Sequence, residues 1–321
     1  EINKISKKVS KNLRKSIDIA YTRIKKFHLK QKNTSFTYKD KYKNELSYRY
    51  TSIDKVGVYV PGGTASYPST VLMNCIPALV AGVRNIYLTT PSLGSLVNPA
   101  IIYAAKKCGV KEIYKTGGAH SIAAFTYGTK TFKKVDKIVG PGNMYVASAK
   151  KEVFGEVGID MVAGPSEVSI IADKDSNPDW IASDLIAQAE HDTFSQSILI
   201  TNSKDLIKSV NSSLKLQLKN LPKKQIASKS LKNFGLAVYT KKISNIVEAV
   251  NIIAPEHLEI NFKNYTKLIK NIKNAGSIFI GKFSPEAMGD YIAGPNHVLP
   301  TSGSAKFSSG LSVNDFLKRH S

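Results

Sequence analysis

The sequence is poor in several residue types, and each shortage excludes a class of protein. Its two cysteines, Cys75 and Cys108, lie in apolar helical contexts. This predicts two small buried hydrophobes in a reduced compartment, and neither a disulfide framework nor a metal pair. No apolar run reaches the roughly eighteen residues of a membrane span, so no membrane partner is expected. The lysine-rich first thirty residues do not resemble a signal peptide. We therefore expect a cytoplasmic protein.

Arginine is also scarce, although the net charge is +22. Only five of the 46 basic residues are arginine, the side chain that nucleic-acid recognition favours. Residues 56–104 contain one basic residue, Arg84, and residues 175–203 contain none. The glycine-rich segments are thus the least basic, which indicates a solvated lysine-rich surface, and we expect no nucleic-acid partner. A nucleic-acid binder stays a weaker alternative, and it would show DNA retention that falls steeply with salt.

From residue 55 onward, short β-branched runs alternate with apolar helical patterns. Strands are expected at 55–60 and 85–90, a strand with a following turn at 112–118 and at 135–143, and further strands at 167–173, 197–201, 235–240, 257–260 and 277–281. This alternation predicts an α/β fold with open, mostly parallel sheets and helices on both faces. The first such unit ends near residue 165. Residues 1–32 are expected to form one long N-terminal helix.

The stretch IAQAEHD (186–192) places two polar residues in an apolar helical pattern. Gln188 and His191 are three residues apart, so they share one helix face. An imidazole and an amide oxygen in this arrangement can both reach one metal ion. A buried, hydrogen-bonded histidine beside a surface glutamine explains the same pattern, and the spacing alone favours that explanation.

Other polar residues occur in turns. Glu256 and His257 stand side by side after a proline, and a carboxylate beside an imidazole suits proton transfer near neutral pH. Asp290 and His297 bracket the loop GDYIAGPNH, and His120 follows GGA. Turn capping or solvation is the default interpretation of each alone. GPGN (140–143) and GPSE (164–167) offer backbone N–H groups to an anion, but no dinucleotide fingerprint of spaced glycines is present.

Together these segments resemble the histidinol dehydrogenase family. The matching stretches include VGVYVPGGTASYPSTVLMNC, VDKIVGPGNMYV, IDMVAGPSEVSIIAD, ASDLIAQAEHD, APEHLEI and GDYIAGPNHVLPTSG, in family order. The resemblance implies a zinc-containing, NAD-dependent enzyme that oxidises L-histidinol through L-histidinaldehyde to L-histidine, the last step of histidine biosynthesis. It also implies two Rossmann-like, incomplete doubly wound domains. Residues 1–58 and 168–310 would form the domain with zinc and catalytic residues. Residues 59–167 would form an inserted domain with NAD contacts, and residues 311–321 would begin a C-terminal region.

The resemblance also implies a role for each matching residue. Glu256 and His257 match the catalytic acid/base pair, and Gln188, His191 and Asp290 match ligands of one Zn2+ ion per subunit. The substrate would contact Ser166, Gln188, His191, His257, Asp290 and, by a weaker match, His297. Tyr59 and Asn143 match NAD-contacting positions. His120 stands where the family carries glutamine in this set.

The resemblance leaves both ends of the family pattern unmatched. The family continues past the KR segment with a tail that carries the last zinc-ligand histidine and reaches the partner subunit of a homodimer. An active site shared across that interface is therefore expected, with the fourth zinc ligand outside this sequence. The alternative is a truncated histidinol-dehydrogenase-like protein with weak or no activity. Because five costly polar residues of the site are all present, the active enzyme is favoured.

Overall fold

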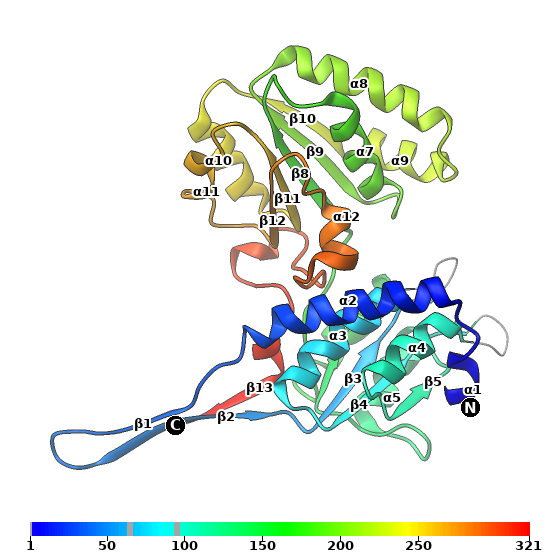
Figure 1. Cartoon of the computed structure of the whole chain (residues 1–321), viewed down its shortest axis with the longest axis vertical. Helices are drawn as coiled ribbons and strands as arrows, with labels where there is room; N and C mark the ends of the chain where they lie inside the picture. The colour runs from blue at the N-terminus through cyan, green and yellow to red at the C-terminus, as the bar shows by residue number, and fades with distance from the viewer. Residues whose placement is uncertain (1, 63–66, 93–96) are drawn as a thin grey trace. The chain divides into compact units, whose positions relative to one another are not determined.

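The computed structural model describes residues 2–62, 67–92 and 97–321. The chain folds into two compact units (Figure 1). Unit 1 comprises Glu1–Val162, Asp290–Val298 and Leu311–Ser321, and unit 2 comprises Ala163–Gly289 and Leu299–Gly310. Each unit is built around its own five-stranded parallel sheet. Among the described residues, no helix is both long and apolar enough to cross a membrane.

The sheet of unit 1 has the strand order β5-β4-β3-β6-β7, and every neighbouring pair is parallel. Its strands are β3 (Lys55–Tyr59), β4 (Asn85–Thr89), β5 (Glu112–Tyr114), β6 (Lys137–Val139) and β7 (Gly158–Ile159). The connecting helices are α3 (Pro68–Ala81), α4 (Pro99–Lys107), α5 (Gly118–Tyr127) and α6 (Met144–Val153). The strand order reverses between β3 and β6, where parallel sheets form a ligand crevice at their carboxyl ends.

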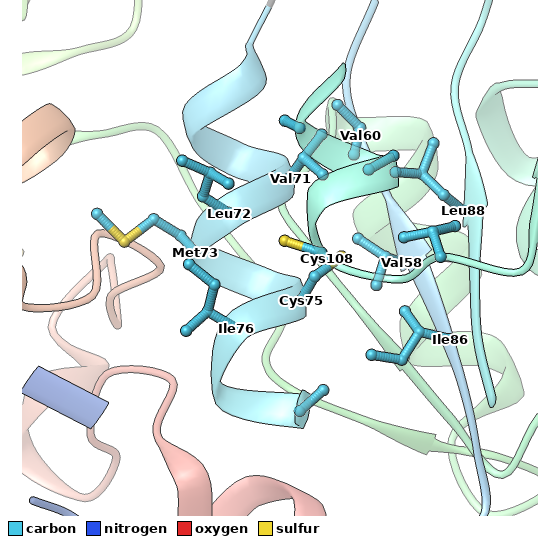
Figure 2. Packing of buried hydrophobic residues seen from close by; sticks show 14 of the residues in the cluster. Val58, Val60, Val71, Leu72, Met73, Cys75, Ile76, Ile86, Leu88 and Cys108 are labelled. Atoms are coloured by element: carbon cyan, nitrogen blue, oxygen red, sulfur yellow. The ribbon is translucent and has the colours of Figure 1, made fainter. Parts of the chain in front are cut away.

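Helices cover both faces of this sheet, as the sequence predicted. Helices α3 and α4 pack on one face through a buried cluster that includes Val58, Leu72 and Leu88 (Figure 2). On the other face, Phe125 of α5 belongs to a second buried cluster with residues of α6 and β6. Cys75 and Cys108 are free, buried thiols in the first cluster, so they serve as small core hydrophobes.

Unit 2 repeats the same architecture. Its sheet has the order β10-β9-β8-β11-β12, again with every pair parallel. The strands are β8 (Glu167–Ala172), β9 (Gln196–Thr201), β10 (Gly235–Tyr239), β11 (His257–Asn261) and β12 (Ser277–Ile280). The helices are α7 (Pro178–Ala189), α8 (Lys204–Lys219), α9 (Lys224–Phe234), α10 (Ile243–Ile253), α11 (Tyr265–Ile269) and the short α12 (Glu286–Met288). The α/β fold with two mostly parallel, Rossmann-like sheets is therefore confirmed.

The N-terminal region differs in detail from the single helix expected over 1–32. Helix α1 (Ile2–Ser6) ends early, and α2 (Lys11–Leu29) begins after Ser10, whose Oγ accepts a hydrogen bond from the Leu13 N–H at 3.3 Å. Ser10 caps the N-terminus of α2, so a new helix begins there and residues 1–32 do not form one continuous helix. A small antiparallel sheet, unanticipated from the sequence, joins β1 (Phe36–Lys39), β2 (Glu45–Ser52) and β13 (Leu317–His320).

The compact units divide the chain differently from the ranges that the resemblance implied. Residues 2–52 belong to unit 1, whereas the resemblance grouped 1–58 with 168–310. The physical reason is the apolar stripe of α2: Ile17, Ala20 and Ile24 are buried in the same cluster as α3 and α4. The remaining C-terminal pieces are η1 (Gly289–Ala293), η2 (Ser304–Lys306) and η3 (Val313–Phe316).

Candidate functional site

The three residues expected to contact NAD all lie at the carboxyl edge of the unit 1 sheet. Tyr59 ends β3, and its buried hydroxyl accepts a hydrogen bond from the Gly118 N–H at 3.2 Å, at the start of α5. His120 is an exposed residue in the first turn of α5. Asn143 caps α6, where its Oδ1 accepts from the Val146 N–H at 3.2 Å. This edge therefore presents two helix N-termini, a favourable setting for phosphate groups.

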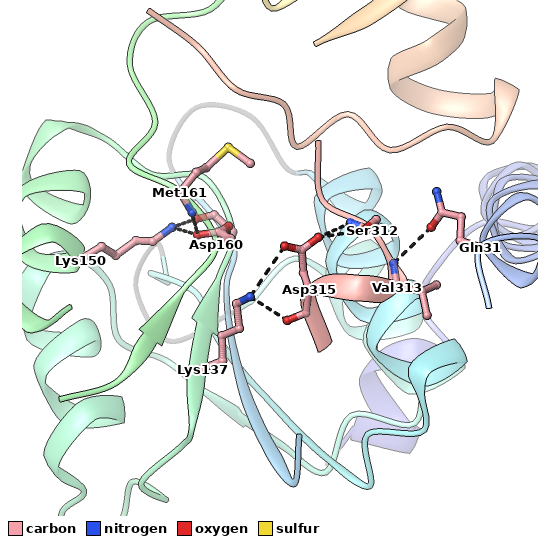
Figure 3. A network of polar contacts seen from close by, with 9 residues as sticks. Gln31, Lys137, Lys150, Asp160, Met161, Ser312, Val313 and Asp315 are labelled. Carbon is pink, nitrogen blue, oxygen red and sulfur yellow. Dashed lines mark hydrogen bonds and ion pairs between the residues drawn. The ribbon is translucent and has the colours of Figure 1, made fainter. Parts of the chain in front are cut away.

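The GPGN turn after β6 is held in place by the buried side chains of Lys150 and Asp160. Gly140 has φ of 113°, and a Cβ there would lie 2.1 Å from the Tyr59 carbonyl oxygen, so only glycine fits. The Gly140 N–H donates to Asp160 at 2.7 Å, and the Gly140 carbonyl accepts from Lys150 Nζ at 3.1 Å. Lys150 and Asp160 also form a fully buried ion pair beneath the turn (Figure 3). The N–H and the carbonyl of Gly140 are thus both hydrogen-bonded to buried side chains, and these bonds fix the turn that carries Asn143.

In unit 2, Gln188 and His191 lie together at the end of α7. The Gln188 side chain is fully buried, and its Nε2 lies 3.3 Å from His191 Nδ1. Within the described residues, the Gln188 Oε1 atom has no hydrogen-bond partner. A buried amide oxygen without a partner costs free energy, so the arrangement indicates a ligand at this point.

Glu256 and His257 lie where β11 begins, beside the start of β8. Glu256 Oε2 accepts from the Glu167 N–H at 2.9 Å, and His257 Nδ1 lies 3.2 Å from the Glu167 carbonyl oxygen. The carbonyl can only accept, so Nδ1 carries the proton and Nε2 is the basic nitrogen of the neutral ring. His257 Nδ1 is also 3.7 Å from a carboxylate oxygen of Glu256 and of Glu286. Both side chains are buried.

A second row of carboxylates supports this group. The Glu286 N–H donates to Glu259 Oε1 at 2.7 Å, and Asp184 of α7 hydrogen-bonds to Glu259. Burial raises the pKa of Glu259 to about 9, and the nearby Asp184 charge adds to the shift. Burial also raises the pKa of Asp184 to about 6. Glu259 is therefore protonated at neutral pH, and its carboxyl group donates a hydrogen bond to the Asp184 carboxylate. Asp184 lies one helical turn before Gln188 in α7.

Asp290 completes a possible metal-binding group. It follows α12 in one continuous helical segment, four residues after Glu286, so local chain geometry brings these two carboxylates together. His257, Glu286 and Asp290 each offer one ligand atom, and these atoms lie within 4.8 Å of one another. Imidazole nitrogen and carboxylate oxygen are ligands that zinc accepts. This group shares only Asp290 with the ligand set expected from the resemblance.

The two remaining expected residues, Ser166 and His297, lie in loops. Ser166 directly precedes β8, and its carbonyl accepts from the Gln196 N–H at 3.0 Å. His297 Nδ1 lies 2.9 Å from the Asp290 carbonyl oxygen. The preceding residue, Asn296, is buried and donates to the Met73 carbonyl at 2.6 Å, which anchors the loop within unit 1.

The sequence argument missed the supporting carboxylates of this site. Asp184 lies in the middle of α7 and Glu259 in the middle of β11, where the residue types alone give no sign of burial, and Glu286 is in the first turn of α12, where acidic residues are common. Asp184, Glu259 and Glu167 stand in stretches quoted above, but the sequence assigned none of them a role. Their burial is the unusual feature, and it depends on packing between distant segments.

Comparisons with known proteins show which family this chain resembles. A family model described as histidinol dehydrogenase matches residues 1–321. The chain is 57% identical over 320 residues to the histidinol dehydrogenase of Pelagibacter ubique, covering 99% of this chain and 75% of that protein. It is 51% identical over 321 residues to that of Agrobacterium fabrum, covering 100% of this chain and 74% of that protein.

A solved structure supports the same assignment. The crystal structure of histidinol dehydrogenase from Elizabethkingia anophelis has a TM-score of 0.96 and 42% sequence identity to this chain. The match covers 99% of this chain and 74% of that one. On the family model, the relatives and this shared fold, the chain belongs to the histidinol dehydrogenase family of oxidoreductases.

Proposed function

We propose that the protein oxidises L-histidinol to L-histidine in two NAD-dependent steps, through L-histidinaldehyde, with one zinc ion per subunit. This is the last step of histidine biosynthesis. One observation carries the proposal: the Oε1 atom of buried Gln188 has no hydrogen-bond partner among the described residues, and the Gln188 side chain lies beside His191. Gln188 is on α7, the same helix whose Asp184 hydrogen-bonds to Glu259 of β11, the strand that begins with His257. Membership of the family supplies the reaction class.

The residues fit a zinc ion. We propose Gln188, His191 and Asp290 as its ligands, with a fourth ligand from outside these residues. The buried Oε1 of Gln188 gains a partner on binding, which offsets its desolvation. A bound zinc ion would hold the imidazole and amino nitrogens of the substrate and so orient it. His257 and Glu286, which lie with Asp290, would then border the substrate.

We assign the proton transfers to His257 and Glu256. The alcohol carbon loses a hydride to NAD while His257 Nε2 takes the hydroxyl proton, which leaves the aldehyde. Glu256 next takes a proton from water as the water oxygen bonds to the aldehyde carbon, and the protonated His257 returns its proton to the former carbonyl oxygen, which gives the hydrate. A second hydride then leaves from the hydrate to a second NAD as its hydroxyl proton is removed. The Glu167 carbonyl contributes by holding His257 in the tautomer that leaves Nε2 basic.

The cofactor and substrate assignments follow the same logic. Tyr59, His120 and Asn143 lie together at the carboxyl edge of the unit 1 sheet, and we propose that they contact NAD there. Ser166 lies directly before β8, on the same sheet edge as His257, and we assign it a substrate contact. His297 receives a weaker assignment of the same kind. We further propose a cytoplasmic homodimer with a shared active site, without nucleic-acid or membrane partners.

The deciding experiment follows NADH absorbance with purified protein, zinc, NAD and L-histidinol. His257→Ala and Glu256→Gln are the catalytic variants, and Lys208→Ala, on the exposed side of α8, is the matched control. Glu256→Gln should still reduce NAD with L-histidinol but lose most oxidation of added L-histidinaldehyde. If the unaltered protein forms NADH from L-histidinol no faster than the His257→Ala variant does, the proposal is refuted.

The alternative of a truncated, weakly active protein is tested with a chimera. The C-terminal segment of the Pelagibacter ubique relative is fused to this chain, because the chain covers 75% of that relative. If the tail supplies a ligand, the chimera should bind zinc more tightly and turn over faster, and its mass in solution should be that of a dimer. Equal zinc content and turnover would refute the role of the tail.

A further inference from the structure

The proposed reaction uses residues at only one end of the parallel strands of unit 2. Ser166, Glu256 and His257 lie at the amino ends of β8 and β11. The opposite edge carries a pocket of about 580 Å³ at the carboxyl ends of β8, β11 and β12. It lies where the strand order reverses between β8 and β11, the position at which open parallel sheets bind ligands. A volume of several hundred cubic ångströms is typical of small-molecule sites.

Aromatic side chains supply the apolar part of this pocket. Trp180 is 45% exposed, Tyr265 is 40% exposed, and both line it. Phe283 lies beside Trp180, with ring centroids 5.6 Å apart. Grouped at one pocket, these aromatic side chains offer stacking faces to a planar ring.

The charges of the pocket leave lysine available. Asp173 Oδ2 accepts from the Lys263 N–H at 2.7 Å and Asp173 Oδ1 from the Asp175 N–H at 3.1 Å, so Asp173 ties the loops together. Asp175 pairs with Lys174 at 3.2 Å. Within the described part of the chain, the Lys263 ammonium forms no ion pair, and Lys282 Nζ lies 5.0 Å from the centroid of the Phe283 ring. Asp173 keeps its own negative charge, so Lys174, Lys263 and Lys282 together with the two aspartates leave one net positive charge at the pocket.

The loops after β8 and β11 contain no glycine, unlike the GPGN turn of unit 1, although Gly281, after β12, lines the pocket. The side chains of Lys263 and Lys282 are the cationic donors that the lining offers to an anion. We propose that this pocket binds a planar aromatic ring that carries one phosphate or carboxylate, of the size of a nucleoside monophosphate. The ring stacks on Trp180 and Tyr265, and the anion pairs with Lys263 and Lys282. This inference is independent of the proposed reaction.

Trp180 is the only tryptophan of the chain, so its fluorescence reports this pocket directly. The intact protein is titrated with adenosine 5′-monophosphate, with benzoate, with adenosine and with inorganic phosphate. We expect saturable quenching by at least one of the two aromatic anions, and a much weaker effect of adenosine or phosphate alone. Saturation by the nucleotide but not by benzoate assigns the ligand to nucleotides, and the reverse result assigns it to aromatic acids.

Variants test whether the signal arises at this pocket. Lys263→Ala and Lys282→Ala should each weaken binding about tenfold, because each removes one charge-assisted contact. The backbone N–H of Lys263 persists in alanine, so the bond to Asp173 and the fold are retained. Lys208→Ala removes the same charge from α8, and Asn143→Ala alters the proposed NAD edge; both should leave the affinity unchanged. Absence of saturable quenching, or an affinity of both pocket variants equal to that of the unaltered protein, would overturn the proposal.

Discussion

The buried ion pair of Lys150 and Asp160 leads to a prediction about stability in which a second substitution restores part of the stability that the first one removes. Asp160 accepts two backbone hydrogen bonds at 2.7 Å, from the N–H groups of Gly140 and Met161, and it pairs with Lys150 (Figure 3). Asp160→Leu removes all three contacts. Lys150 then keeps only the Gly140 carbonyl, at 3.1 Å, in a site where its side chain is 2% exposed. A buried charge without its partner costs about 3–5 kcal/mol, so we expect a loss of that size.

Lys150→Met should cost less, about 1–3 kcal/mol, because Asp160 keeps both backbone donors. The double variant Lys150→Met/Asp160→Leu leaves no buried charge, but it leaves the Gly140 and Met161 N–H groups without acceptors and the Gly140 carbonyl without the lysine donor. We therefore expect it to be more stable than Asp160→Leu alone, by roughly 2 kcal/mol, since removing the stranded charge outweighs the lost lysine contacts.

Urea unfolding measures the effect if each unit has its own reporter. Cys75 and Cys108 are buried in unit 1, so their reaction with a thiol reagent reports unfolding of that unit. Trp180 fluorescence reports unit 2 in the same sample. A double variant less stable than Asp160→Leu would refute the reasoning, because the stranded lysine would then not be the main cost.

Three further predictions rest on single positions. Gly140→Ala should cost several kcal/mol by denaturation, whereas Gly109→Ala, also at positive φ but with open space around a Cβ, should cost only about 1–2 kcal/mol. Burial lowers the pKa of His28, so stability should fall as the pH drops from about 7 to 5, and less so in His28→Gln; equal pH dependence would contradict this. Gln188→Met should raise metal-free stability by about 1 kcal/mol and lower zinc content measured by mass spectrometry.

The sign for His28 follows from its contacts. Its Nδ1 lies 2.8 Å from the Ile24 carbonyl oxygen, and its Nε2 lies 3.3 Å from the Asn296 side-chain nitrogen, a donor. The neutral ring satisfies both, whereas a protonated ring would place an N–H against another N–H. The folded state therefore disfavours the proton that the unfolded state accepts near pH 6.5. The stability that the neutral ring contributes is present above that pH and is lost below it.

Regular elements with a strong local signal could be predicted well. The run 167–173 is rich in apolar and β-branched residues and contains the buried strand β8, and Asn177 followed by Pro178 marked the start of α7. The hairpin of β1 and β2 was not anticipated, because its residues are mostly exposed and carry little apolar alternation. Its third strand, β13, comes from the far end of the chain, and no local pattern encodes that pairing.

The sequence by itself determined the class of fold and the family motifs, because β-branched runs, helix caps and glycine turns act over a few residues. It also marked Gln188, His191, Glu256 and His257 as candidates. Only the tertiary structure decided that Gln188 Oε1 is buried without a partner, and that Glu259 stands between Asp184 and Glu286. These facts depend on packing between α7, β11 and α12, which lie far apart in the sequence. Burial of a polar atom is a property of its whole surroundings, so no short stretch of sequence can specify it.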